Sequence, residues 1–465
     1  MKAENSENRD CPQRDSAEHE GYGEVLRSFR SIWKEKDSAQ PELLEKILYK
    51  DNLNRAYKRV KANKGAPGID GITVDEIGAY LGDNQEAMIE RIYKGKYTPD
   101  PVRRKEIPKA DGGMRKLGIP TVTDRIFQQA IAQQLMPIYE ARFSEGSYGY
   151  RPGRSAKDAI IKVKEYAEEG YRFAVTIDLS KYFDTLNHEL LLNLLRRNVK
   201  DERVIQWIKR YLKSGVMEDG VVVDTEEGSP QGGNLSPLLA NVYLNEFDQE
   251  FQKRGVPFVR YADDIVVLAK SERAAKRLLE TSTNYLEGKL KLTVNKEKSR
   301  VVSVFAIRNF KFLGFALGRN GKGIYVRVHP KSWKKFKSKL KELSSRRSVQ
   351  SIRSALGKIK VYARGWLNYY GVASIKNPVD DINGWLYHRI RMCIWKQWKK
   401  PKTKKRNLMK LGISEYFAHQ AANSRRKHWY VSGMGAVNRA LTKERLINSG
   451  FYDLAIAYQS VHINY

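Results

Sequence analysis

Two adjacent carboxylates interrupt an apolar, β-branched stretch in the second half of the chain. Asp263 and Asp264 lie between 258–261 and 265–268, two runs that have the pattern of the arms of a β-hairpin. Aspartate is depleted in strands, and a buried carboxylate pair is costly unless a positive charge neutralises it. The segment therefore predicts either a divalent metal site for phosphate chemistry or a surface hairpin with a solvated acidic turn.

A third carboxylate ends a second apolar segment. The strand predicted for 173–178 closes with Asp178, and 185–199 has a helical pattern. The carboxyl end of a strand is a common place for functional groups in α/β sheets. Three converging carboxylates would bind two Mg²⁺ ions, because Mg²⁺ takes a few carboxylates and completes its shell with phosphates and water. Two such ions, about 3.5–4 Å apart, suit nucleotidyl transfer.

The charge distribution points to a polyanionic partner. The chain has 465 residues and a net charge of +32. Residues 319–465 hold 32 Lys and Arg against 6 Asp and Glu, so +26 of this charge lies in the last third. Counterion release would drive binding to nucleic acid, and salt would weaken it. We find no apolar run of transmembrane length and no signal-peptide pattern, so we expect a cytoplasmic protein without a membrane partner.

Ordered blocks around the carboxylates resemble those of reverse transcriptases. The segment 261–264 is similar to the catalytic box of that family, and the other polymerase blocks follow the family's order at 107–120, 147–155, 228–237 and 312–315. Residues 364–370 resemble the maturase domain of group II intron-encoded proteins. The chain ends without paired Cys and His ligands of a nuclease domain, which resembles the compact bacterial class C group.

The resemblance implies an α+β fold shaped like a right hand, with fingers, an antiparallel-sheet palm, a helical thumb and a basic α-helical C-terminal domain. We expect five regions: a disordered extension over 1–40, the N-terminal motif and fingers over 41–170, the palm over 171–317, the thumb or maturase domain over 318–384, and a DNA- and RNA-binding domain over 385–465. Palm strands are expected at 173–178, 258–261, 265–269 and 311–315.

The resemblance also implies catalytic roles. Asp178, Asp263 and Asp264 would hold two Mg²⁺ ions, and the carbonyl of Leu179 would complete the shell of one. Lys298 would protonate the departing pyrophosphate.

Further residues would hold the nucleotide. Phe183 would lie under the sugar and block a ribose 2′-hydroxyl; the alternative is an ordinary core phenylalanine. Lys109 and Arg115, on either side of a predicted turn at 111–113, would clamp the triphosphate, although by composition they could equally be surface charges. Gln231 would position the nucleotide and the template base.

Other residues predict contacts with nucleic acid. Gly232 would allow close approach of a ligand, and Arg151 and Arg154 would contact template phosphates. Arg364 and Trp366 belong to a segment in which aromatic and polar residues alternate. Aromatic residues in such a pattern pack in a protein core more often than they bind nucleic acid. Cations mixed with tryptophans suit RNA or DNA, although 402–406 could be a solvated loop; the cations are Lys399, Lys400, Lys402, Lys404, Lys405 and Arg406.

We therefore expect an RNA-directed DNA polymerase that extends a DNA primer on an RNA template with dNTPs. As a maturase it would also bind group II intron RNA, assist its splicing and act on target DNA during retromobility. One alternative is a related bacterial reverse transcriptase recruited to another task; the block at 364–370 and the basic C-terminal region argue against it. The other is an RNA-binding splicing factor with an inactive polymerase, against which the three aspartates and Phe183 argue.

Overall fold

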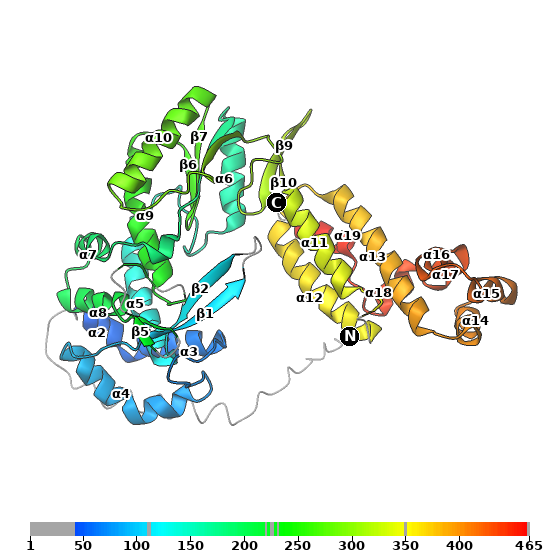
Figure 1. Cartoon of the computed structure of the whole chain (residues 1–465), viewed down its shortest axis with the longest axis horizontal. Coiled ribbons are helices and arrows are strands. Elements are labelled where there is room, and N and C mark those ends of the chain that lie inside the picture. The colour runs from blue at the N-terminus through cyan, green and yellow to red at the C-terminus, as the bar shows by residue number, and fades with distance from the viewer. Residues whose placement is uncertain are drawn as a thin grey trace, which may run out of the picture.

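A computed structural model describes residues 42–108, 113–218, 221–223, 227–229, 232–347 and 351–462. The extension predicted for 1–40 lies outside these residues, and so do Lys109 and Gln231. The N-terminal helices and a first sheet form one end of the molecule, a second sheet with its helices lies beside them, and the C-terminal helices form the other end (Figure 1).

The region predicted as the fingers, called the fingers below, combines helices with a small sheet, which two strands from the region predicted as the palm complete. The helices of the fingers are α2 (Leu43–Leu48), α3 (Lys50–Ala62), α4 (Ile77–Tyr93) and α5 (Val122–Glu140). The strand order is β2-β1-β4-β5, and only the β1–β4 pair is parallel. The strands are β1 (Val102–Pro108), β2 (Met114–Ile119), β4 (Val216–Glu218) and β5 (Val221–Val223).

The region predicted as the palm holds a four-stranded antiparallel sheet, called the palm sheet below, in the order β6-β7-β3-β8. Its strands are β3 (Phe173–Ile177), β6 (Phe258–Tyr261), β7 (Asp264–Ala269) and β8 (Arg300–Ser303). The strand predicted at 311–315 is wrong. Leu313 and Gly314 have φ of 51° and 84°, so the chain turns there and enters a separate hairpin, β9 (Phe315–Asn320) with β10 (Gly323–Val328).

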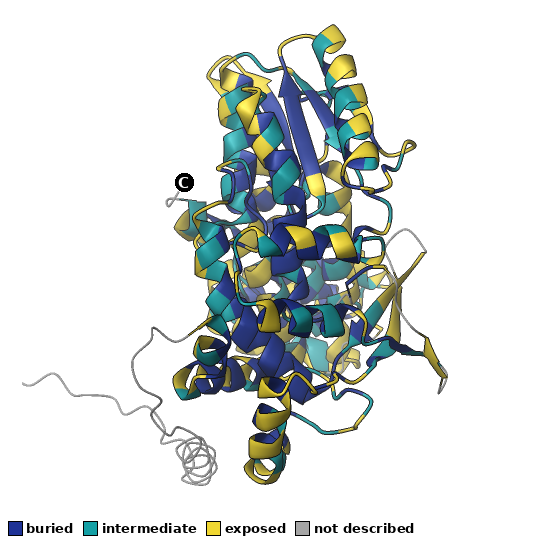
Figure 2. Ribbon diagram, turned by 90° about the vertical axis from the view of Figure 1, so that its left-hand side faces the viewer, coloured by how far each residue is buried: buried dark blue, intermediate teal, exposed yellow. Residues whose placement is uncertain are grey.

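Both faces of the palm sheet are covered, and alternate side chains along each strand serve different cores. Val175 and Ile177 join the core that includes α9 (Ser236–Lys253) and α10 (Glu272–Gly288). Ala174 joins the core of α6 (Ala156–Glu168) and the C-terminal helices. Figure 2 shows the strands β3, β6 and β7 of this sheet largely buried, whereas about half of the residues of β1 and β2 and all of β5 are exposed.

Helices make up the C-terminal third. α11 (Pro330–Leu343), α12 (Ile352–Tyr370), α13 (Lys376–Gln397) and α19 (Leu454–His462) share the core on the second face of the palm. A separate core around Trp395 and Leu408 joins the end of α13 to shorter helices. Those helices are α14 (Pro401–Lys410), α15 (Glu415–Ala422), α16 (His428–Ser432) and α17 (Gly435–Ala440), and α18 (Lys443–Asn448) follows them.

Two expectations for this region are corrected. The boundary expected between 384 and 385 falls inside α13, which runs without a break from one core to the other. The segment 402–406, interpreted as a possible loop, belongs to α14. None of the helices among the described residues combines the length and the hydrophobicity needed to cross a membrane.

Candidate polymerase active site and nucleic-acid surfaces

The paired aspartates lie where β6 turns into β7. Tyr261 pairs with Asp264, so Ala262 and Asp263 form a two-residue hairpin loop. Ala262 adopts a φ of 57°, a left-handed conformation that costs an alanine roughly 1–2 kcal/mol. Gly149 packs against this loop so closely that a Cβ there would lie 2.3 Å from the nitrogen of Ala262. The block at 147–155 therefore supports the loop through its backbone.

Strand register brings Asp178 to the same place. Ile177 pairs with Ile265, so the next position along each strand sets Asp178 beside Asp264. Because side chains alternate along a strand, these two carboxylates project from one face of the sheet. The structure thus brings together residues that are far apart in the sequence.

The pKa values of these aspartates show their proximity. Burial, followed by the charges of Asp263 and Asp178, raises the pKa of Asp264 to about 6. Burial also raises the pKa of Asp263, an effect that the guanidinium of Arg115 and other groups reduce and the charge of Asp178 reinforces. Such a set of hard oxygen ligands is disfavoured as free anions, and a divalent cation would relieve the repulsion.

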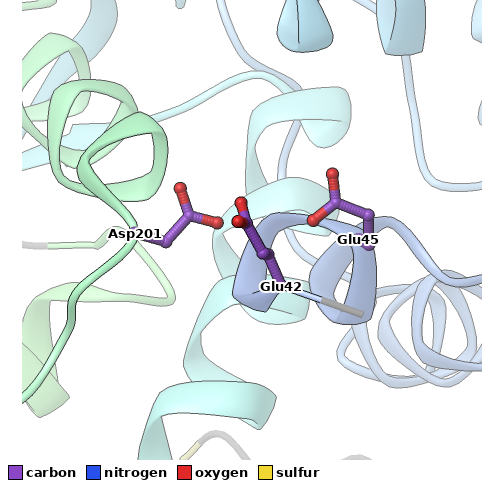
Figure 3. A group of neighbouring side chains, drawn as sticks. All are labelled: Glu42, Glu45 and Asp201. Carbon is purple, nitrogen blue, oxygen red and sulfur yellow. The ribbon is translucent and has the colours of Figure 1, made fainter. Parts of the chain in front are cut away.

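The carboxylate oxygens are not drawn into one tight cluster. Among the described residues, the only three acidic groups whose oxygens all lie within 4.8 Å of one another are Glu42, Glu45 and Asp201 (Figure 3). Arg203 forms ion pairs with all three, at 2.5, 2.9 and 2.9 Å, so those carboxylates are already held by a cation.

A buried arginine anchors the catalytic hairpin from behind. Arg260 has no exposed surface and pairs with Asp248 of α9, which is also fully buried. Its guanidinium donates to the carbonyl of Ala262 at 3.0 Å, to Oδ1 of Asn241 at 2.9 Å and to Oγ of Ser147 at 2.9 Å. The arginine therefore holds the loop, α9 and the 147–155 block in one fixed arrangement.

This network was missed by sequence reasoning. Arg260 belongs to a run interpreted as an apolar arm of the hairpin, and the sequence pattern names no acidic partner for it. A charged residue at an inward position of a buried strand was the available signal, because buried charges require a partner. Tyr150 was also overlooked as an individual residue: it is 45% exposed, and burial and the charge of Asp263 raise its pKa.

Lys298 and Leu179 lie beside Asp178. The Nζ of Lys298 is 3.8 Å from Oδ2 of Asp178, and its side chain is 61% exposed and free to reach a ligand. The Leu179 side chain is buried. Backbone hydrogen bonds join its neighbours to the segment before Lys298: the amide of Ser180 donates to the carbonyl of Thr293, and the amide of Asn295 donates to the carbonyl of Asp178. The proton-donor role of Lys298 and the metal role of Leu179 remain predictions.

Phe183 lies in the short 3₁₀ turn Tyr182–Asp184 that follows β3. Its ring is half-buried and meets Tyr182 edge to face at 5.3 Å. The chain at 228–229 runs against this turn: Ser229 donates to the carbonyl of Phe183, and a Cβ on Gly228 would collide with it at 2.9 Å. The structure therefore places the start of the 228–237 block beside Phe183, and the sugar-sensing role remains a prediction.

The fingers contribute Arg115 to the neighbourhood of the aspartates. Arg115 lies on β2 and is one of the charges that lower the pKa of Asp263. Gly232 is exposed, has a φ of 139°, and could not carry a Cβ because one would lie 2.3 Å from the carbonyl of Gly118. Close packing of two backbones thus accounts for this glycine, while its contact with nucleic acid is untested.

The two arginines expected on template phosphates are engaged within the protein. Arg151 has a side chain that is 2% exposed, pairs with Glu140, and donates to the carbonyls of Ser144 and Ser147. Arg154 pairs with Glu145 and lies over the ring of Tyr148. The prediction for Arg151 is wrong because its donors are buried and satisfied, and Arg154 stabilises the same turn.

Trp366 is a second correction. Its ring stacks on Phe336 at 4.0 Å and also contacts Trp333 and Tyr370 at 4.9 and 4.6 Å, so it belongs to the packing between α11 and α12. Arg364, two residues earlier, is exposed. The aromatic residues therefore form a core stripe, as the alternative interpretation predicts; Trp366 is half-buried, and Arg364 is the more accessible of the two.

The cations near α14 divide into two sets. Lys404 lies over the ring of Trp395 at 4.9 Å, and Lys405 pairs with Glu415 at 2.5 Å, so both also serve the fold. The exposed set is Lys399, Lys400, Lys402 and Arg406. These four are the stronger candidates for phosphate contacts.

An antiparallel sheet whose hairpin carries aspartates, with an arginine of a second sheet nearby, is typical of nucleotidyl transferases of the polymerase class. The reverse transcriptase (RNA-dependent DNA polymerase) family matches residues 107–317, and the maturase-specific domain of group II introns matches 333–412. The first match runs from the end of β1 into β9, and the second runs from α11 to the turn after α14.

Curated relatives agree. Protein YkfC of Escherichia coli (strain K12) is 35% identical over 60% of this chain and 83% of its own length. Group II intron-encoded protein LtrA of Lactococcus lactis subsp. cremoris is 34% identical over 57% of this chain, which spans under half (43%) of LtrA. A putative COX1/OXI3 intron 2 protein of Saccharomyces cerevisiae is 29% identical over 56% of the chain and 37% of its own length. The chain belongs to the group II intron-encoded reverse transcriptase/maturase family, and so is an RNA-directed DNA polymerase and intron maturase.

Proposed function

We propose that the chain extends a DNA primer on an RNA template with dNTPs, using two Mg²⁺ ions, and that it binds group II intron RNA and target DNA during splicing and retromobility in the cytoplasm. The observation that carries the polymerase assignment is the placement of Asp178 beside Asp264, next to the anchored Asp263. Family membership and the positive charge of the last third support the RNA-binding role.

Each residue near the aspartates has a defined task in this proposal. Asp178, Asp263 and Asp264, with the carbonyl of Leu179, would hold the ions. The bound Mg²⁺ would lower the pKa of the primer 3′-hydroxyl and offset the charge of the leaving pyrophosphate. Arg115, and Lys109 outside the described residues, would hold the triphosphate, Gln231 would orient the base, and Phe183 would contact the sugar.

Catalysis would then depend mainly on positioning and charge. The buried Arg260 keeps the hairpin loop in one conformation, so the carboxylates need not reorganise when substrate binds. Lys298, beside Asp178, would donate a proton to the departing pyrophosphate.

A primer-extension assay tests the proposal. A 5′-labelled DNA primer annealed to a non-intron RNA template should lengthen when Mg²⁺ and dNTPs are both present, and EDTA should stop it. The same protein should retain a labelled intron RNA in a filter-binding assay. Absence of extension with intact RNA binding would instead indicate a splicing factor with an inactive polymerase.

A further inference from the structure

A groove of about 350 Å³ lies between three C-terminal helices, away from the aspartate hairpin. One wall is a single face of α11, and the others come from α13 and α16. The residues lining it are cations and tryptophans with one serine: Lys334, Lys337, Ser338, Lys341, Trp385, Arg389 and Trp429.

The lysines of α11 converge on the groove without anionic partners. Lys334, Lys337 and Lys341 occupy positions i, i+3 and i+7 of the helix, so they share one face. All three are exposed, and within the described part of the chain none of them forms an ion pair. Unpaired like charges held this close repel one another, and an anion between them would be stabilised.

Arg389 has a different task. Its Nε donates to Oγ of Ser344 at 2.6 Å, and its Nη2 donates to the carbonyls of Lys341 and Ser344 at 2.8 and 2.9 Å. These bonds fasten the end of α11 to α13. The wall of lysines is therefore fixed relative to the tryptophans on the other helices.

The two tryptophans differ in availability. Trp385 lies between two cations, with Nζ of Lys337 at 5.4 Å and Cζ of Arg389 at 5.0 Å from its ring centre. Its ring therefore holds these cations in the groove by cation–π interactions. Trp429 is 42% exposed and stacks on His388 at 3.7 Å, and Nε2 of His388 donates to its carbonyl at 2.8 Å. An aromatic ring supported from beneath in this way is a platform for a base.

We propose that this groove binds an unpaired nucleotide of single-stranded RNA, with its base on Trp429 and its phosphates on the lysines of α11. This rests on the RNA-binding part of the proposed function. A groove of this volume holds one nucleotide, and the bases of a duplex are already stacked and paired. The lining side chains offer donors and a single hydroxyl, Ser338, so recognition would be by stacking and charge and would tolerate any base.

Photocrosslinking of the full chain tests the site directly. The probe is a 5′-labelled RNA octamer of adenosines with one central 5-iodouridine, irradiated on the protein and mapped by mass spectrometry of the peptides. The expected adduct is on the peptide that contains Trp429. An adduct confined to other peptides would overturn the proposal.

Affinity measurements sharpen the test. Trp429→Ala should weaken binding of the all-adenosine octamer about tenfold, whereas Trp429→Phe should restore most of it. Lys334→Gln with Lys341→Gln should lower the slope of log affinity against log salt by about 1.4. Tyr416→Ala is the matched control, because Tyr416 is 72% exposed on the neighbouring helix α15 and lies outside the groove.

One outcome separates this proposal from the proposed function. Failure of the wild type to extend a primer on a non-intron template would count against the polymerase and leave the octamer result standing. Binding of an RNA duplex of the same length as tightly as the octamer would refute the assignment to an unpaired strand. Binding by Trp429→Ala within twofold of wild type would refute the base platform.

Discussion

The palm and the C-terminal helices handle charge in opposite ways. In the palm, one fully buried ion pair, Arg260 with Asp248, holds a loop whose aspartates repel each other. In the C-terminal helices, most cations lie at the surface, and those lining the groove on α11 have no acidic partner among the described residues. Buried charges fix the geometry of the palm, whereas the exposed cations of the C-terminal region form a surface whose binding to nucleic acid depends on salt.

This contrast explains how one chain can serve two tasks. Transfer of a nucleotide requires reacting atoms placed to within a fraction of an ångström, which buried hydrogen bonds provide. Holding a large folded RNA requires many modest contacts whose sum matters more than any one of them. Substitutions should therefore have concentrated effects in the palm and distributed effects in the C-terminal helices.

The largest effect should come from the aspartates. Asp263→Asn should reduce primer extension by roughly 10³-fold or more, because it removes the charge of a proposed metal ligand. Intron RNA binding should not change. Asp184→Asn is the matched control, since Asp184 is an exposed carboxylate in the turn after β3. Loss of RNA binding by Asp263→Asn would contradict the assignment of catalysis to the palm and of RNA binding to the C-terminal helices.

The buried pair should show an effect on both stability and activity. Asp248→Leu leaves Arg260 buried without its anion and should destabilise the fold by about 3–5 kcal/mol in urea unfolding. The double variant Arg260→Met with Asp248→Leu should regain most of that stability. It should still extend primers poorly, because the bond to the carbonyl of Ala262 is gone. Wild-type activity in the double variant would show that the pair serves folding alone.

Protonation should control Mg²⁺ binding in the palm. The pKa of Asp264 is raised from 3.8 to about 6, so folding disfavours its ionised form, and the stability of the metal-free protein should fall as pH rises from about 4 through 6. Mg²⁺ binds the ionised form. The increase in Tm that Mg²⁺ produces should therefore grow across this pH range and vanish below it, as differential scanning fluorimetry can measure. If the increase in Tm produced by Mg²⁺ did not depend on pH, the ions would bind at a site that does not include Asp264.

Phe183 should affect the choice of sugar. Phe183→Ala should raise incorporation of ribonucleotides relative to deoxyribonucleotides by about tenfold or more, because the half-buried ring no longer limits space at the 2′ position. Single-nucleotide extension with each triphosphate measures the ratio. Phe173→Ala, at a half-buried phenylalanine that begins the preceding strand β3, controls for general loosening. An unchanged ratio would leave Phe183 a core residue.

Sequence reasoning succeeded where local pattern determines structure. The hairpin around Asp263, the strand before Asp178 and the helices of the C-terminal third follow from hydrophobic periodicity and turn residues. It failed for Arg151 and Trp366, because their partners, Glu140 and Phe336, are set by tertiary packing that composition does not reveal. The edge strand of the palm was misplaced because residues 313 and 314 reverse the chain within an otherwise strand-like run.

The smallest effects should be those of single C-terminal cations. Lys399→Gln or Lys402→Gln should each lower the slope of log RNA affinity against log salt by about 0.7–0.9, because each removes one phosphate contact from an exposed position. Lys405→Gln should change the slope less, since Glu415 already neutralises that lysine. Extension of a saturating primer-template should not differ among the three. If all three gave the same slope, pairing within the fold would not govern which cations meet the RNA, and the contrast between the two regions would reduce to net charge alone.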